Sequence, residues 1–260
     1  MNCRHIFAVA TCLCLFALAA AAAPTTLPAP FFNGSTYYNV TNTTVTISSP
    51  GTYPNGPISA VANAYPNAAS YLSAGCGFAY PDVCSPGGAL DIVYYFTVTG
   101  GNIGDTVTVD VNAALRAATT SSNVGSNSLV QTSASIAVSV NSNVFSQSLA
   151  NGCVGACSYS NTWVGTFTVP MLVGDVASID MNTLVSLWEG APGASGSAIA
   201  YADPYIYIDP NTPNAGLYGI VVSPGVGNSP LGSTPEPSSL MLLGSGVIGV
   251  AGLVRRKFLR

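Results

Sequence analysis

Side chains able to carry out catalysis are scarce in this sequence. No histidine follows His5, and the only lysine is Lys257. The long middle of the chain therefore cannot assemble a Ser-His-Asp or Cys-His site, a Ser-Lys pair or a lysine Schiff base. These absences exclude most hydrolase mechanisms, and we expect a protein that is not an enzyme.

Glycoside hydrolysis is the catalytic chemistry that the residues still permit, because it needs only two carboxyl groups at a defined separation. Glu189 is the single glutamate between residues 23 and 234, and it directly follows Trp188. An acid beside a tryptophan in a loop is one way to build a sugar subsite. The pattern favours a simpler interpretation, a solvated loop acid beside a partly buried tryptophan.

Aromatic side chains offer a non-catalytic way to contact sugars. Tyr205 and Tyr207 lie two residues apart near an expected strand, and Trp188 precedes a loop. An aromatic ring combines an apolar body with a polar tip and can stack on a sugar ring. Tyrosine is also a good strand former, so the same residues fit an ordinary sheet surface.

Hard metal ions would need oxygen ligands, which the aspartates supply. Asp203 and Asp209 flank the expected strand from Tyr205 to Ile208, and a structural calcium there is an open alternative. No EF-hand or repeat-type calcium spacing is present. We therefore expect solvated turn aspartates and no cofactor.

The charge of the middle of the chain narrows the possible partners. Between residues 23 and 234 there are nine acidic side chains and one basic side chain, Arg116, which gives a formal net charge of −8. Such a surface repels nucleic acid and anionic lipid. We expect neither as a partner.

Period-two alternation predicts the elements that must position these residues. Three segments show it clearly, in residues 106–111, 135–140 and 205–209, and further strands are expected in 43–48, 91–99, 161–169, 176–187 and 217–222. A turn is an open alternative only at Ala113–Ala118. These eight segments with one or two more, nine or ten strands in all, predict an all-β fold, an antiparallel two-sheet sandwich with jelly-roll-like connections.

One internal similarity supports this fold. Residues 103–112 align with residues 173–182 at four identical positions, and each copy follows a Phe-Thr-Val sequence. The unit is typical of a β-hairpin with Gly-Asp at the turn. We expect two equivalent hairpins within one sandwich.

The first residues are typical of a secretory signal peptide. Arg4 and His5 precede an apolar run from Ile6 to Ala19, and small residues follow from Ala20 to Ala23. We assign residues 1–22 to a signal helix and exclude them from the fold. A lipoprotein signal at Cys12 or Cys14 is a weaker alternative.

Four cysteines remain after the signal peptide, in two close pairs, Cys76 with Cys84 and Cys153 with Cys157. Four cysteines allow three connectivities, and local pairing in an oxidising compartment is the simplest. The spacing of the second pair would also fit a metal knuckle, but the lack of histidine argues against zinc.

The last part of the sequence has three segments in a fixed order. A Gly/Pro linker in residues 223–234 is expected to be a flexible stalk after an ectodomain in residues 23–222. The triplet Pro235, Glu236 and Pro237 then forms an extended stem. The uncharged run in 240–254 would make a transmembrane helix about 22 Å long, shorter than the hydrocarbon core of about 30 Å. The basic residues that follow should stay cytoplasmic; they are Arg255, Arg256, Lys257 and Arg260.

Residues 235–260 resemble the PEP-CTERM sorting signal of Gram-negative bacteria, which shares the triplet, the short glycine-bearing span and the basic cluster. The resemblance implies recognition of the triplet by a membrane-embedded exosortase, transient insertion in the inner membrane, removal of the tail, and delivery to the cell surface or exopolysaccharide matrix. An ordinary single-span anchor is the alternative.

These observations predict a secreted protein of the cell envelope or biofilm matrix, with a non-catalytic structural or adhesive role. A carbohydrate-binding module that contacts exopolysaccharide through Tyr205, Tyr207 and Trp188 is the alternative. A glycoside-active enzyme is the third possibility.

Overall fold

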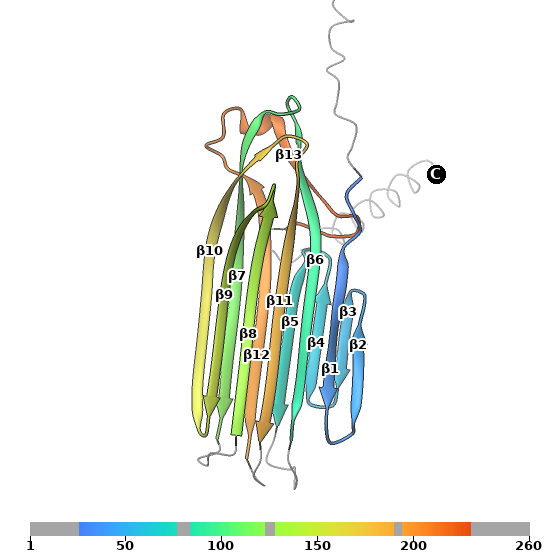
Figure 1. The fold of residues 1–260 in the computed structure, drawn as a ribbon, viewed down its shortest axis with the longest axis vertical. Coiled ribbons are helices and arrows are strands. Elements are labelled where there is room, and N and C mark those ends of the chain that lie inside the picture. Colours follow the sequence, from blue (N-terminus) through green and yellow to red (C-terminus); the bar gives the residue numbers. More distant parts are fainter. Residues whose placement is uncertain (1–25, 77–83, 123–127, 190–193, 230–260) are drawn as a thin grey trace, which may run out of the picture.

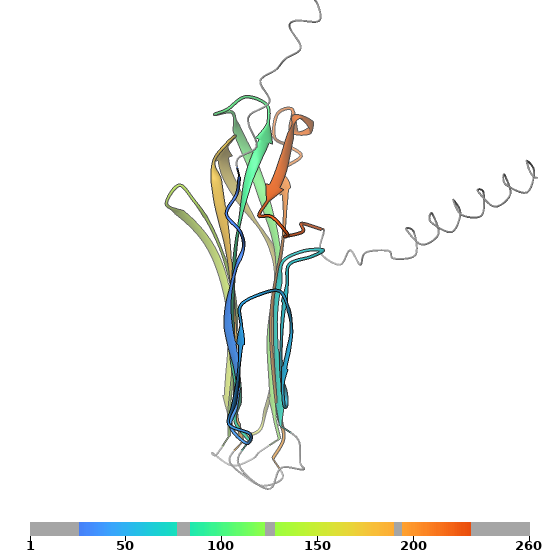
Figure 2. The same ribbon diagram turned by 90° about the vertical axis from the view of Figure 1, so that its right-hand side faces the viewer.

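Two antiparallel β-sheets lie face to face along the long axis of the molecule (Figures 1 and 2). This computed structural model describes residues 26–76, 84–122, 128–189 and 194–229. The expected signal helix and transmembrane helix lie outside these residues. The elements are β1 (Phe31–Tyr38), β2 (Thr43–Ile47), β3 (Gly51–Asn55), β4 (Ile58–Asn63), β5 (Ala69–Cys76), β6 (Pro86–Gly100), β7 (Thr106–Ser121), β8 (Ser128–Val140), β9 (Asn143–Val154), β10 (Cys157–Leu172), β11 (Val176–Glu189), β12 (Gly196–Ile208), the 3-10 helix η1 (Ala215–Leu217) and β13 (Tyr218–Val222).

The strand order confirms an antiparallel two-sheet sandwich. The seven-stranded sheet has the order β2-β1-β6-β11-β8-β9, with β13 paired to the last residues of β6. The six-stranded sheet has the order β10-β7-β12-β5-β4-β3. The eight consecutive strands β5 to β12 make up the order β6-β11-β8-β9 in the first sheet and β10-β7-β12-β5 in the second. This is the strand order of a jelly roll.

The core fills the space between the sheets, and period-two alternation directs apolar side chains into it. In β7, Val107, Val109 and Val111 are fully buried, and Ala113 and Leu115 continue the same inward row. The turn considered at Ala113–Ala118 therefore does not form. Packing between the facing sheets outweighs the weak local preference of alanine for helix.

The two similar segments are not hairpins, which corrects the sequence prediction. Each one carries the chain from one sheet to the other, from β6 to β7 and from β10 to β11. Their turns lie against each other, because Gly104 N donates to Val173 O at 3.2 Å and Val173 N donates to Asp105 O at 2.9 Å. Gly104 and Gly174 have φ of +88° and +96°, a backbone region that glycine adopts without strain. Alternation is the same in a hairpin and in a cross-sheet arch, so the sequence pattern could not separate them.

Both expected disulfides are present, with local pairing. Cys76–Cys84 joins the end of β5 in one sheet to the residues that lead into β6 in the other. Cys153–Cys157 joins the end of β9 to the start of β10, again across the two sheets. Each bridge thus closes a connection between the layers of the sandwich.

The described part of the predicted linker, residues 223–229, is docked on the sandwich. Ser223 N donates to Tyr95 O at 2.8 Å, and Val226 is buried against the core. The side chain of Asn228 makes two hydrogen bonds to the backbone of Ile206. Its Oδ1 accepts from Ile206 N at 2.8 Å, and its Nδ2 donates to Ile206 O at 2.7 Å. The flexible stalk expected from residue 223 therefore does not begin there. Within the described residues, no helix has the length and apolar character needed to cross a membrane.

Candidate functional site

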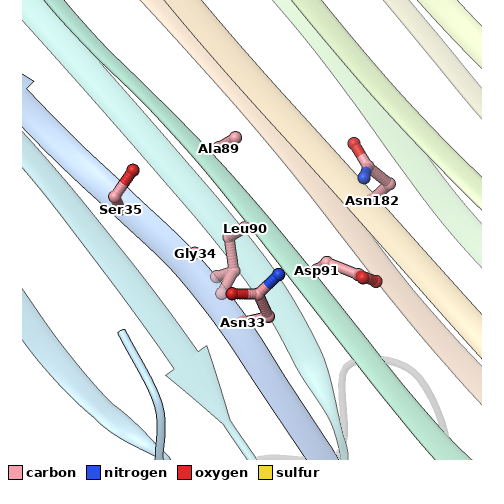
Figure 3. Close-up of a pocket in the computed structure, with 7 residues that line it drawn as sticks. All are labelled: Asn33, Gly34, Ser35, Ala89, Leu90, Asp91 and Asn182. Carbon is pink, nitrogen blue, oxygen red and sulfur yellow. The ribbon is translucent and has the colours of Figure 1, made fainter. Parts of the chain in front are cut away.

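A row of polar side chains crosses the outer face of the seven-stranded sheet. Strand pairing places Asn33 of β1 opposite Asp91 of β6, and Asp91 opposite Asn182 of β11. The row continues to Ser135 of β8 and Ser148 of β9. Figure 3 shows Asn33 and Asn182 on either side of Asp91. Five strands thus contribute one polar group each, because alternate residues of a strand point to the same face.

The row lies in two adjoining shallow depressions, of about 440 and about 410 Å³, which share Asp91 and Asn182. Small side chains at Ala89 and Ala137 keep the surface low around the carboxylate. Gly34 allows β1 to lie close to β6, since a Cβ there would be 2.5 Å from Ala89 O. The result is an open, polar groove that crosses the strands. We call it the outer groove.

The electrostatics of the outer groove centre on two aspartates. Burial, then the charge of Asp180, then a hydrogen bond to Asp180 raise the pKa of Asp91 to about 6. Asp91 Oδ1 is enclosed and has no hydrogen-bond partner among the described residues. Asp180 lies two residues from Asn182 on β11, so the carboxyl groups of Asp91 and Asp180 are diagonal neighbours on the same face of the sheet. Polar binding is the chemistry that this arrangement supports.

Glu189 and Trp188 do not form a common site, which corrects the sequence interpretation. They are the last two residues of β11 and point to opposite faces of the sheet. Trp188 is 39% exposed on the outer face, whereas Glu189 is 2% exposed and lies between the sheets. The carboxylate reaches Gly196 of the other sheet, where a Cβ would collide with Glu189 Oε1. Glu189 is therefore not a solvated loop acid.

Tyr205 and Tyr207 lie on β12 of the six-stranded sheet, on the opposite side of the sandwich from Trp188. Their ring centroids are 5.5 Å apart and the rings are stacked, with an interplanar angle of 21°. Burial, followed by the nearby Asp110 carboxylate, raises the pKa of Tyr207. The three aromatic residues expected to contact sugar are thus divided between two faces, and the two tyrosines cover part of each other.

Asp203 and Asp209 do not share a calcium site. They are six positions apart along β12 and the residue after it, which is about 20 Å of extended chain. Asp203 is 6% exposed and accepts hydrogen bonds from Tyr201 and from Asn67. Asp209 accepts from the backbone and side chain of Asn211 in a turn. Among the residues that the structure describes, no three His, Cys, Asp or Glu side chains are placed to hold a metal ion.

Sequence reasoning did not identify Asn33, Asp91 or Asn182 as a group. The alternation around Asp91 does place it on the wet face of its strand. The partner strands lie about 60 and 90 residues away in the sequence, and no local signal reports which strands become neighbours.

The predicted sorting residues, Pro235, Glu236 and Pro237 with the basic residues 255–257 and 260, lie outside the described residues. Comparison with known protein families does cover this segment of the chain. The family model described as "PEP-CTERM protein-sorting motif" matches residues 233–257. No curated protein matches the sequence.

Two solved structures have a limited likeness to the fold. One is described as "Family 16 Carbohydrate Binding Module-2", with 14% identity, 60% of this chain and 89% of that chain covered, and a TM-score of 0.19. The other is "Structure of Arabinose-Bound MgGH51 a-L-Arabinofuranosidase Crystal Type 1", with 14% identity, 59% and 23% covered, and a TM-score of 0.20. Likenesses of this size carry no information on function. The family match is specific, and the chain carries a PEP-CTERM protein-sorting motif in residues 233–257, which indicates an exported protein sorted through an exosortase.

Proposed function

We propose that this protein is a non-catalytic component of the cell surface or extracellular matrix. The observation that carries the proposal is the sorting motif in residues 233–257. The tail inserts transiently in the inner membrane, an exosortase recognises Pro235, Glu236 and Pro237, and the sandwich is delivered outside the cell. Two disulfides across the sheets support this, because such bonds persist in oxidising compartments.

A non-catalytic role is supported by how the acidic side chains are used. Asp203 is held by Tyr201 and Asn67, and Glu189 is buried between the sheets. These carboxylates are enclosed within the fold. The sequence between residues 23 and 234 also lacks histidine and lysine. A structural or adhesive function needs none of the missing groups.

The proposal is tested by following the removal of the C-terminal tail in the producing cell. The Glu236→Gln chain should accumulate in the membrane fraction with its tail intact, while the wild-type chain loses the tail. Ser238→Ala, two residues away, is the matched control and should be processed normally. Mass determination of both termini distinguishes the forms. Normal processing of Glu236→Gln would contradict recognition of the triplet.

A second candidate function is binding of a neutral polysaccharide in the outer groove. The observation that favours it is the row of Asn33, Asp91 and Asn182 across three adjacent strands. Amide groups donate and accept, and carboxylates accept, so the row can pair with successive sugar hydroxyls. The formal net charge of −8 between residues 23 and 234 repels anionic polymers. A neutral exopolysaccharide is therefore the ligand class.

Variants on the two outer faces of the sandwich serve as controls for each other in one binding experiment. Full-length variants are tested for retention on the neutral exopolysaccharide fraction of the producing strain. Asn33→Ala with Asn182→Ala should weaken retention about tenfold or more, since each removes one or more hydrogen bonds. Tyr205→Ala with Tyr207→Ala, on the other face, should leave it unchanged. Loss of retention in the tyrosine variant alone would exclude the outer groove as the site.

A further inference from the structure

The two sides of the sandwich end in very different edge strands. On one side, β2 and β3 have five residues each, and β3 contains Pro54. On the other side, β9 has 12 residues and β10 has 16. Soluble proteins usually protect exposed edges with short strands, prolines or charged side chains. On the first side both edge strands are short, whereas on the second side the proline of β10, Pro170, lies near the end of the strand and leaves residues 157–169 without one.

The long edges carry no charge. From residue 117 to residue 174 the sequence contains no Asp, Glu, Lys or Arg, and this stretch includes all of β8, β9 and β10. Outside it, the chain between residues 23 and 234 holds nine acidic side chains and Arg116. Two copies of this acidic protein can therefore approach with little repulsion at the side formed by β9 and β10.

The edge of β10 that faces away from β7 is not paired with another described strand. Among the described residues β10 pairs only with β7. Val164 is 70% exposed and Tyr159 is 54% exposed. Figure 2 shows the hairpin of β8 and β9 bending away from the facing sheet at its upper end, so this hairpin does not cover the upper part of β10.

We propose that a second copy of this chain adds to the six-stranded sheet, with β10 pairing antiparallel to β10 of the other copy across a two-fold axis. An antiparallel strand pair is self-complementary under such an axis, so one surface serves both partners. The pairing satisfies edge N–H and C=O groups that otherwise face water. An uncharged edge on an acidic body fits a second copy better than a charged partner. This inference goes beyond the proposed function and holds whether or not the outer groove binds polysaccharide.

The test measures the mass of the full-length chain in mild detergent by light scattering, from about 1 μM to about 1 mM protein. The wild-type chain should show a concentration-dependent dimer. Val164 and Thr166 lie at the middle of β10, where the two-fold axis of a centred strand pair passes. Val164→Lys with Thr166→Lys therefore brings like charges close together across the axis, and this repulsion should raise the dissociation constant about tenfold or more. Thr44→Lys with Thr46→Lys places the same charges on the outer face of edge strand β2, and should dimerise like wild type.

Hydrogen exchange of the wild-type chain gives a second readout that needs no substitution. Amides in β10 should exchange more slowly as the protein concentration rises, and amides in β2 should not change. A chain that stays monomeric over the whole range overturns the proposal. The proposal is also overturned if the chain with Val164→Lys and Thr166→Lys still dimerises while the β10 amides of the wild-type chain exchange at the same rate at every concentration. That result would place the contact in the tail or on another surface.

Discussion

Asp91 of β6 and Asp180 of β11 are diagonal neighbours on the outer face of the seven-stranded sheet, because Asp91 is paired with Asn182, two residues along the strand from Asp180. Partial burial disfavours the charged form of Asp91, and the nearby charge of Asp180 disfavours it further. The pKa of Asp91 is therefore raised from 3.8 to about 6. The centre of the outer groove changes its charge close to neutral pH.

This pair predicts a pH dependence of stability. Because the folded pKa lies above the unfolded value, the folded state binds the proton more tightly, and stability is lost as pH rises from about 4 through about 6. Asp91→Asn should remove this loss and raise the free energy of unfolding at pH 7.5 by roughly 1 kcal/mol, allowing for solvent screening of a partly exposed group. Urea unfolding between pH 4 and pH 8 measures it.

The control for this prediction is the partner residue. Asp180→Asn removes the second and third causes of the shift, so the pKa of Asp91 should fall toward its usual value in an NMR titration. An Asp91 pKa that is the same in both proteins would show that Asp180 does not perturb it.

Asn67 should matter for stability through Asp203. Its amide donates to Asp203 Oδ1 at 2.6 Å, and burial raises the pKa of this carboxyl group while the hydrogen bonds from Tyr201 and Asn67 lower it. Asn67→Ala leaves a buried acceptor without one donor and should cost about 1–3 kcal/mol of unfolding free energy. Asn33→Ala, at an exposed position, should cost no more than about 0.5 kcal/mol. Equal effects in urea unfolding would contradict the role given to Asn67.

The docked segment should respond to loss of Asn228. Asn228→Ala removes both hydrogen bonds to the backbone of Ile206 and should cost about 1–3 kcal/mol of local stability. Limited proteolysis of the wild-type chain should spare residues 223–229, and the variant should be cut within them. Ser229→Ala, which removes one side-chain bond to Pro66 O at 3.2 Å, is the milder comparison. Rapid cleavage of this segment in the wild type would contradict docking.

The disulfide at Cys76 and Cys84 should stabilise the join between the sheets. Closing a loop of this length constrains the unfolded chain by about 2–3 kcal/mol. Replacing both cysteines with serine should lower the unfolding free energy by about that amount. Peptide mapping without reduction should find Cys76 linked to Cys84 and Cys153 linked to Cys157; any link between the two pairs would contradict the fold at this end.

Local pattern was enough to find several strands of this protein. The alternation at Val107, Val109 and Val111 predicted an inward row of β7, and the close spacing of the cysteines predicted both disulfides. By contrast, β9 was missed. Its inward side alternates between apolar and polar residues, with Phe145, Gln147, Leu149 and Asn151, because an edge strand is only half covered. Its residues therefore lack the signal of a buried face.

The sequence by itself determined the sorting motif, the all-β class and the face on which each clear strand presents its side chains, because these depend on residues that are neighbours in the chain. Only the tertiary structure decided that Asp91 meets Asn182 and that Glu189 is buried against Gly196. It also decided that the two similar segments cross between sheets and that residues 223–229 are docked. These features depend on which distant strands become neighbours, and that choice follows from closing one shared core rather than from any local period.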